Sequence, residues 1–194
     1  MIKAIQLLFV PGQAWAKIVA SRRGVLGNLL WDLLPLLLLS AVAEGAALLH
    51  GGDSQGQFGG HVAFTAPLIW RLEIIQILMG LIMVVAGAKL IRWISESFHL
   101  YPSYAHCFLV AAYGLSPVFI MRFLNCIPGM NPWITWALGA AGCIFVLYQG
   151  VGIVLQPEPT KGFGLYVLIA FTFSLLTAMS HLIALMVLQG KLPL

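Results

Sequence analysis

Charged side chains are scarce in this 194-residue sequence: Asp, Glu, Lys and Arg together make up 8% of it, against about 25% in soluble domains. Apolar residues make up 61%. A water-soluble globule cannot bury that much apolar surface, so the composition excludes a soluble domain and predicts an integral membrane protein. Polar stretches are too short for a separate domain outside the membrane.

Clusters of basic residues and paired cysteines are missing as well. The ten Lys and Arg residues exceed the six acids by a net charge of +4, but they are scattered between apolar runs, which excludes a nucleic-acid partner. The three cysteines are Cys107, Cys126 and Cys143. An odd number without C-x-x-C spacing predicts neither a disulfide framework nor a zinc site.

Sequence signatures of enzymes are also lacking. There is no H-E-x-x-H, no phosphate-binding glycine loop and no G-x-S-x-G. The segment Gly114–Pro117 matches the first four positions of G-x-S-x-G, but the final glycine is missing. Ser180 and His181 are adjacent, so on a helix they point about 100° apart and cannot pair as nucleophile and base. We therefore predict no enzymatic activity and no cofactor.

One loop contains three residue types that bind metals. His50, Asp53 and His61 fall between two apolar runs. A structural metal site needs a fourth ligand and tighter spacing, so we predict no metal here.

Five stretches reach the 20 or so apolar residues that a membrane-spanning helix needs. They are Val25–Leu49, Pro67–Ile91, Tyr104–Asn125, Trp133–Leu155 and Gly164–Leu188. Only helices or closed barrels satisfy the backbone in lipid, and these runs lack the alternation of barrel strands. The sequence therefore predicts an all-α, polytopic helix bundle over residues 25–194, with short polar connectors such as 92–103.

The basic residues predict the orientation of the bundle. Seven of them fall on the side of the N-terminus: Lys3, Lys17, Arg22, Arg23, Lys89, Arg92 and Lys161. Three fall on the other side: Arg71, Arg122 and Lys191. Positively charged loops stay in the cytoplasm, so we expect a multi-pass protein of the cell (inner) membrane with its N-terminus inside and its C-terminus outside. Tryptophans near both ends are expected to act as interfacial anchors, Trp15 and Trp93 inside and Trp70 and Trp133 outside.

Residues 1–24 are amphipathic. Ile5, Leu8 and Phe9 share one helical face, and Trp15 and Ile18 share another after a break at Pro11. Such a pattern is typical of a helix that lies in the membrane plane. A helix that binds a cytosolic partner is the alternative. The segment also mimics a signal peptide, but the bases at positions 22 and 23 oppose translocation, so we expect it to be retained.

Ionisable and polar side chains inside the predicted spans are costly and need partners. Six of them fall in the outer half of the bundle: Glu44, Glu73, Gln76, Arg122, Thr177 and His181. They would either line an outward-facing cavity or join the helices through an ion pair and hydrogen bonds. A second polar group, Asp32 with His106, is expected in the inner half.

Two prolines fall inside predicted spans, and each predicts a helix kink. Pro117 removes a hydrogen bond from the carbonyl of Tyr113, four residues back. Either Ser116 or a neighbouring span is expected to satisfy that carbonyl. Pro35 is expected to have the same effect three residues after Asp32.

Several of these segments together resemble the Ypt-interacting-protein (Yip) family. They are Phe9-x-Pro11-x-x-x-Trp15-x-x-Ile18, Tyr113-Gly114-Leu115-Ser116-Pro117, and Gly150-x-x-x-x-Leu155 before a short basic loop. Eukaryotic members carry a D-L-Y-G-P signature, which Asp32-Leu33-Leu34-Pro35 approaches but with one residue fewer. The resemblance implies a compact, bacterial-type member with five spans. The long hydrophilic N-terminus that family members use for GTPase binding and vesicle traffic is not matched by the two dozen residues here, so GTPase binding does not carry over.

The sequence thus favours a non-enzymatic membrane protein that organises membrane partners or lipids. Its expected partners are the lipid bilayer, further copies of the chain and other membrane proteins. The alternatives are a small transporter or channel that uses the outer polar cluster, and a protein that moves lipids along the polar stripes.

Overall fold

The computed structural model describes residues 2–21, 24–51, 65–127 and 130–188, which form helices and turns without strands. Five helical stretches are long and apolar enough to cross a membrane: Val25–Leu49, Ala66–Ser97, Tyr104–Cys126, Pro132–Leu155 and Pro159–Leu188. The predicted all-α bundle with five spans is therefore confirmed. The loop with Asp53 and His61 lies outside the described residues.

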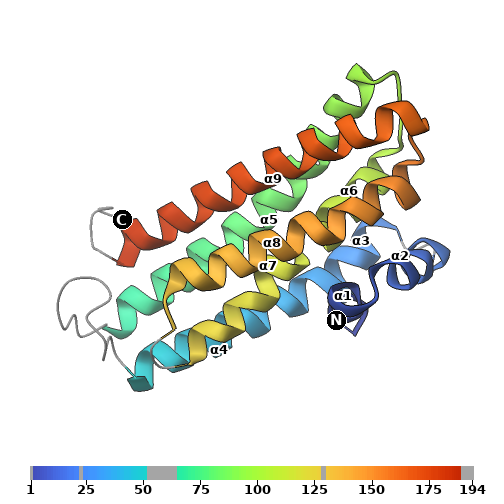
Figure 1. The fold of residues 1–194 in the computed structure, drawn as a ribbon. Coiled ribbons are helices and arrows are strands. Elements are labelled where there is room, and N and C mark those ends of the chain that lie inside the picture. The colour runs from blue at the N-terminus through green and yellow to red at the C-terminus, as the bar shows by residue number, and fades with distance from the viewer. Residues whose placement is uncertain (1, 22–23, 52–64, 128–129, 189–194) are drawn as a thin grey trace.

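The spans run side by side along one axis (Figure 1). The first comprises α3 (Val25–Asn28), the π-helical turn η1 (Leu29–Leu33) and α4 (Leu34–Gly51), and the second is α5 (Ala66–Ser97). The third comprises α6 (Tyr104–Gly114), α7 (Ser116–Met121) and the 3₁₀ turn η2 (Arg122–Cys126). The fourth comprises α8 (Pro132–Gly150) and the π-helical turn η3 (Val151–Leu155), and the fifth is α9 (Pro159–Leu188).

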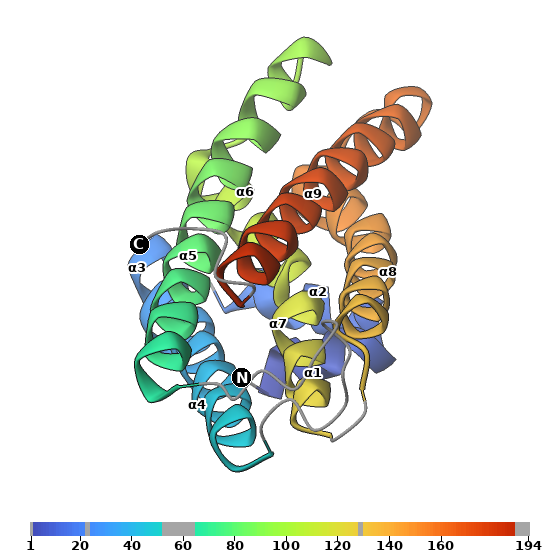
Figure 2. The same cartoon turned by 90° about the vertical axis from the view of Figure 1, so that its left-hand side faces the viewer.

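The third span forms the centre of the bundle. It packs between α4 and α5 on one side and α8 on the other (Figure 2). In the third span, 67% of the most apolar 18-residue stretch is buried inside the protein. This share is larger than in the other four spans that the structure describes. The core is therefore built around α6 and the start of α7, where every residue from Cys107 to Pro117 is buried.

Two helices are longer than their apolar runs predict. α5 continues six residues past Ile91, because Arg92 and Glu96 form an i,i+4 ion pair that suits a helix leaving the apolar layer. The helix ends at Ser97, and the turn that follows is closed by the φ of 61° at His99 and by the hydrogen bond from the Leu100 amide to the Ser95 carbonyl. α9 begins at Pro159, five residues earlier than predicted, since proline suits the first turn of a helix.

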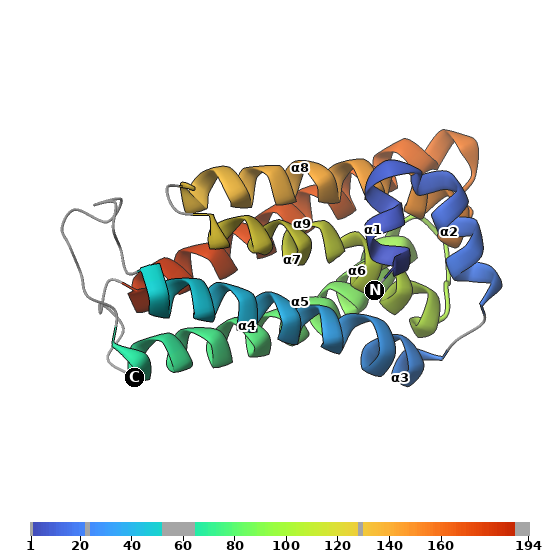
Figure 3. The same cartoon turned by 90° about the horizontal axis from the view of Figure 1, so that it is seen from below.

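The N-terminal segment folds as two helices, α1 (Ile2–Phe9) and α2 (Pro11–Ala20), separated at the predicted break. They cross one end of the bundle over α7 and α8 (Figure 3). Leu7, Trp15 and Ile18 are completely buried there, whereas Phe9 is 80% exposed. Since Ile5 is exposed as well, α1 has apolar surface on two sides, one against the bundle and one facing outward.

Trp15, which was expected at the membrane interface, is buried against the bundle. Its indole is 0% exposed, and Nε1 donates a hydrogen bond of 3.0 Å to the Val146 carbonyl of α8. The ring fits there because Gly150 has no side chain: a Cβ at that position would lie 2.5 Å from Cζ2 of Trp15. Trp15 therefore fixes α2 to the bundle, whereas Trp70 and Trp93 are 65% and 68% exposed.

The two internal prolines coincide with irregular backbone. α6 ends at Gly114 and α7 begins at Ser116, with Pro117 in its first turn. Ser116 Oγ donates a 2.7 Å hydrogen bond to the Tyr113 carbonyl, so this serine satisfies the group that Pro117 leaves free. The wide turn η1 ends two residues before Pro35, which gives the proline ring room without breaking the span.

Candidate functional site

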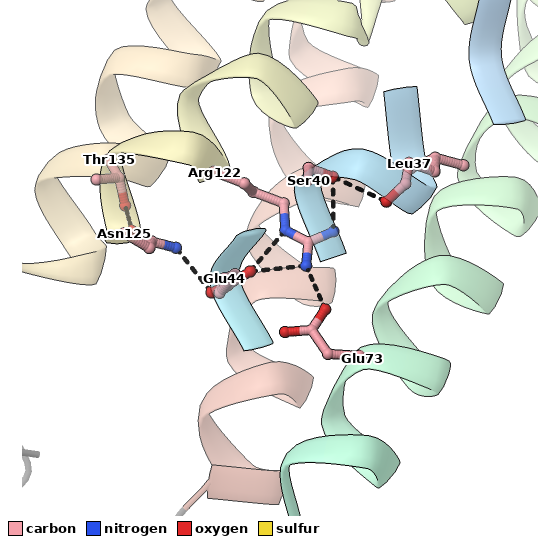
Figure 4. Close-up of polar contacts among 7 residues, drawn as sticks. All are labelled: Leu37, Ser40, Glu44, Glu73, Arg122, Asn125 and Thr135. Carbon is pink, nitrogen blue, oxygen red and sulfur yellow. Dashed lines mark hydrogen bonds and ion pairs between the residues drawn. The ribbon is translucent and has the colours of Figure 1, made fainter. Parts of the chain in front are cut away.

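A guanidinium group joins three spans at the end of the bundle opposite the N-terminal helices (Figure 4). Arg122 begins η2, Glu44 lies on α4 and Glu73 lies on α5. Arg122 donates from Nε and Nη2 to Glu44 Oε2, at 2.9 and 2.7 Å, and from Nη2 to Glu73 Oε2 at 2.9 Å. We call these three residues and their hydrogen-bonded neighbours the Arg122 cluster.

The neighbours extend the network to the fourth span. Asn125 donates from Nδ2 to Glu44 Oε1 at 2.8 Å and accepts from Thr135 Oγ1 at 2.6 Å. Ser40 lies 3.5 Å from Nη1 of Arg122, a long contact, and donates its own hydrogen to the Leu37 carbonyl. Four spans are therefore held by one polar network.

The cluster is nearly closed to its surroundings. Glu44 and Glu73 are 7% and 6% exposed, and the Arg122 side chain is 12% exposed. Charge-assisted bonds in a medium of low polarity are strong, and removing one partner leaves a buried charge that is costly. The arrangement therefore acts first as a joint between helices.

The other three residues expected in the outer group make different contacts. The His181 ring stacks on Trp136 with an interplanar angle of 19° and meets Trp133 edge-on at 4.7 Å between centroids. Thr177 donates to the Ser174 carbonyl of its own helix. Gln76, one turn from Glu73, is half-buried. The structure thus joins Glu44, Glu73 and Arg122 directly and keeps His181 in an aromatic contact.

The inner polar group has a different partner from the one expected. Asp32, on the wide turn η1, accepts a 2.9 Å hydrogen bond from the Tyr113 hydroxyl, while His106 is exposed. A cavity of about 10 Å³, roughly the room for one water, lies beside this pair. It is lined by Ala4, Asn28, Asp32, Leu33, Leu36, Ala112, Tyr113 and Ser116.

Sequence reasoning missed the partners of both groups. Asn125, Thr135 and Ser40 are small polar residues near span ends, where they are common and carry no signal of their own. Tyr113 was detected only as part of the proline-containing segment. Its place on the face of α6 that points to α3 and η1 depends on packing, which one sequence does not specify.

Comparison with known families fits this arrangement. A family model described as the Yip1 domain matches residues 5–181. The chain belongs to the Yip1 family. No curated protein and no solved structure matches it. The Yip1 match covers all five spans in part or whole, together with most of α1 and all of α2.

In this Yip1-family protein, the segments that carried the resemblance meet in space. Trp15 packs edge-on against Tyr113 with 6.1 Å between ring centroids, and Tyr113 donates to Asp32. Trp15 also lies over Gly150. These separate parts of the Yip1 sequence therefore form one contact region between the N-terminal helices and the first, third and fourth spans.

Proposed function

We propose that this Yip1-family protein is a non-enzymatic, bacterial-type membrane organiser that works by side-by-side association in the bilayer, as an oligomer that gathers lipids or other membrane proteins. The absence of catalytic motifs from the sequence supports a non-enzymatic role. The observation that carries the proposal is the weak burial of the last span.

Only 22% of the most apolar 18-residue stretch of α9 is buried in the protein, whereas 67% of the corresponding stretch of the third span is buried. Its outward face carries large apolar side chains at helical spacing. They include Phe171, Leu175, Met179, Leu182 and Met186, which are 44–67% exposed. In a bilayer this continuous face is available to lipid tails or to a helix of a second copy.

The transporter alternative is not favoured by the Arg122 cluster. Its charges pair with one another across α4, α5 and η2 at 2.7–2.9 Å. Charges along a permeation path are expected to face water or a moving solute rather than to saturate one another. The pairing supports a structural role.

Mass spectrometry of the protein extracted with native lipids tests the association. We expect a stable homo-oligomer or a stoichiometric second membrane protein, and we expect the double variant Phe171→Ala/Leu175→Ala to shift the population towards monomer. The matched control is Leu38→Ala/Val42→Ala, which truncates exposed apolar residues of α4. A wild-type protein that is monomeric and alone would refute the proposal, and equal behaviour of the two variants would refute the role of α9.

We further propose that the end carrying α1 and α2 faces the cytoplasm of the cell membrane. Exposed basic side chains lie on three helices: Lys17 on α2, Lys89 and Arg92 on the last third of α5, and Lys161 near the start of α9. Figure 1 shows α2, the end of α5 and the start of α9 toward the same end of the bundle. In a bacterial host, alkaline phosphatase fused to the C-terminus is then expected to be active, and the same enzyme fused to the N-terminus inactive. The reverse pattern would show the opposite orientation.

A further inference from the structure

We propose that the C-terminal part of α5 binds an anionic phospholipid, whose headgroup is held by Lys89, Arg92 and Trp93. This surface lies on a different helix from the outward face of α9, so the proposal does not depend on the association of copies. Three observations support it: the face of α5 that carries these residues, their depth in the apolar layer, and their charge.

The outward face of α5 is an apolar stripe that leads to these residues. The helix packs on α4, α6 and α9 through its other side. Leu78, Ile82 and Val85 are 53%, 56% and 42% exposed and follow one another at helical spacing. Lys89 and Trp93 are exposed and continue the stripe, four and eight residues after Val85. An acyl chain on the stripe would therefore place its headgroup beside Lys89 and Trp93.

The position of Lys89 along the helix matches the edge of a hydrocarbon layer. Arg71 and Lys89 are both exposed and lie 18 residues apart, so they share one face of α5. That separation corresponds to about 27 Å along the helix, close to the roughly 30 Å of a hydrocarbon core. The ammonium group of Lys89 can therefore extend to the lipid phosphates, and Trp93, which is 68% exposed, lies one turn further at the level of the headgroups.

The charges on this face do not balance. Arg92 donates from Nε to Glu96 Oε1 at 3.2 Å, which pairs the acid of this turn. Lys89 forms no ion pair in the described part of the chain. The Nη nitrogens of Arg92 and the indole N–H of Trp93 donate to no described residue. One net positive charge with free N–H donors is complementary to the phosphate oxygens and the single negative charge of an anionic phospholipid.

The sequence of apolar stripe and donors also indicates why the occupant is a lipid. A phospholipid carries an acyl chain and an acidic group in one molecule, in the same order as the stripe and the donors along α5. A zwitterionic lipid such as phosphatidylcholine fits the stripe equally well but has no net charge to balance Lys89. The site is therefore expected to select lipids by the charge of the headgroup.

Native mass spectrometry of the full-length protein in detergent micelles tests the site. Dioleoylphosphatidylglycerol and dioleoylphosphatidylcholine are titrated separately, and bound lipids are counted on the monomer and on each oligomer. The result is then independent of how many copies associate. We expect phosphatidylglycerol to bind the wild type about fivefold more tightly than phosphatidylcholine, the factor that one lysine near the membrane surface contributes.

Lys89→Gln should weaken the binding of phosphatidylglycerol about fivefold and leave that of phosphatidylcholine unchanged. Lys89→Arg keeps the charge and should retain the preference. The matched control is Lys17→Gln, which removes an exposed lysine of α2 and should bind both lipids like the wild type. Arg92→Gln and Trp93→Phe each remove N–H donors and should also weaken the binding of phosphatidylglycerol.

Several results would overturn the proposal. The two lipids might bind the wild type equally, or Lys89→Gln might keep the full preference for phosphatidylglycerol. An equal loss in Lys17→Gln and Lys89→Gln would show a general effect of surface charge instead of a site. If Lys89→Gln changed the distribution of oligomers but not the number of bound lipids, a second copy rather than a lipid would cover this face.

Discussion

Replacing Arg122 with alanine is expected to lower the free energy of unfolding by about 3–5 kcal/mol, the usual cost of breaking a buried ion pair by removing one partner. The loss is large because Glu44 and Glu73 both depend on this guanidinium and are 7% and 6% exposed. Two carboxylates would then be left in the apolar layer without a counter-charge. Reversible unfolding in mixed micelles, followed by circular dichroism, measures the change.

The exposed pair of Arg92 and Glu96 provides the control. Its side chains are 54% and 41% exposed, so Arg92→Ala should cost no more than about 0.5 kcal/mol. Arg122→Lys should fall between the two, because an ammonium keeps the charge but cannot donate to both carboxylates in the same planar geometry. Equal stability of Arg122→Ala and Arg92→Ala would show that the cluster contributes little to the bundle.

The second large effect is expected at Gly150. Valine at this position would place Cβ 2.5 Å from Cζ2 and 2.6 Å from Cε2 of Trp15, which is closer than the two groups can approach. Trp15 must then leave its site, and the loss of one fully buried tryptophan costs about 3–5 kcal/mol. We expect α1 and α2 to detach, with faster amide hydrogen exchange over residues 11–20 and unchanged exchange in α5.

Gly152→Val is the matched control for this variant, since it introduces the same side chain two residues further along. An added Cβ at Gly152 meets nothing within 4 Å, so exchange in α2 should stay at the wild-type rate. If α2 remained as well protected in Gly150→Val as in Gly152→Val, the contact between Trp15 and α8 would not be what holds the N-terminal helices.

Composition and periodicity were enough to predict the helix bundle, because the requirement for long apolar runs in lipid is local. The predicted first span, Val25–Leu49, has the same limits in the structure. The ends of α5 and α9 were missed for the opposite reason. Residues after Ile91 and before Gly164 are polar enough to read as loops, but a helix continues where ion pairs such as Arg92–Glu96 and a favourable proline support it.

Contacts between distant segments were predicted only where charge restricts the choice of partner. A lone arginine and two carboxylates at similar depth have few alternatives, so Glu44, Glu73 and Arg122 could be grouped from the sequence. Trp15 had no such restriction. A tryptophan near a span end is usually an interfacial residue, and its burial depends on Gly150, which lies 135 positions later and gives no sign of its partner.

The contact of Trp15 with α8 also sets an order for biosynthesis. The carbonyl that its indole binds is 131 residues further along the chain. At the usual speed of translation, on the order of ten seconds pass between the synthesis of these two residues. The first two helices are therefore synthesised long before their docking site on α8 exists. Until then the apolar side chains of Leu7 and Ile18 have no bundle to pack against. Docking of the N-terminus is accordingly a late step, completed after the fourth span has left the translocon.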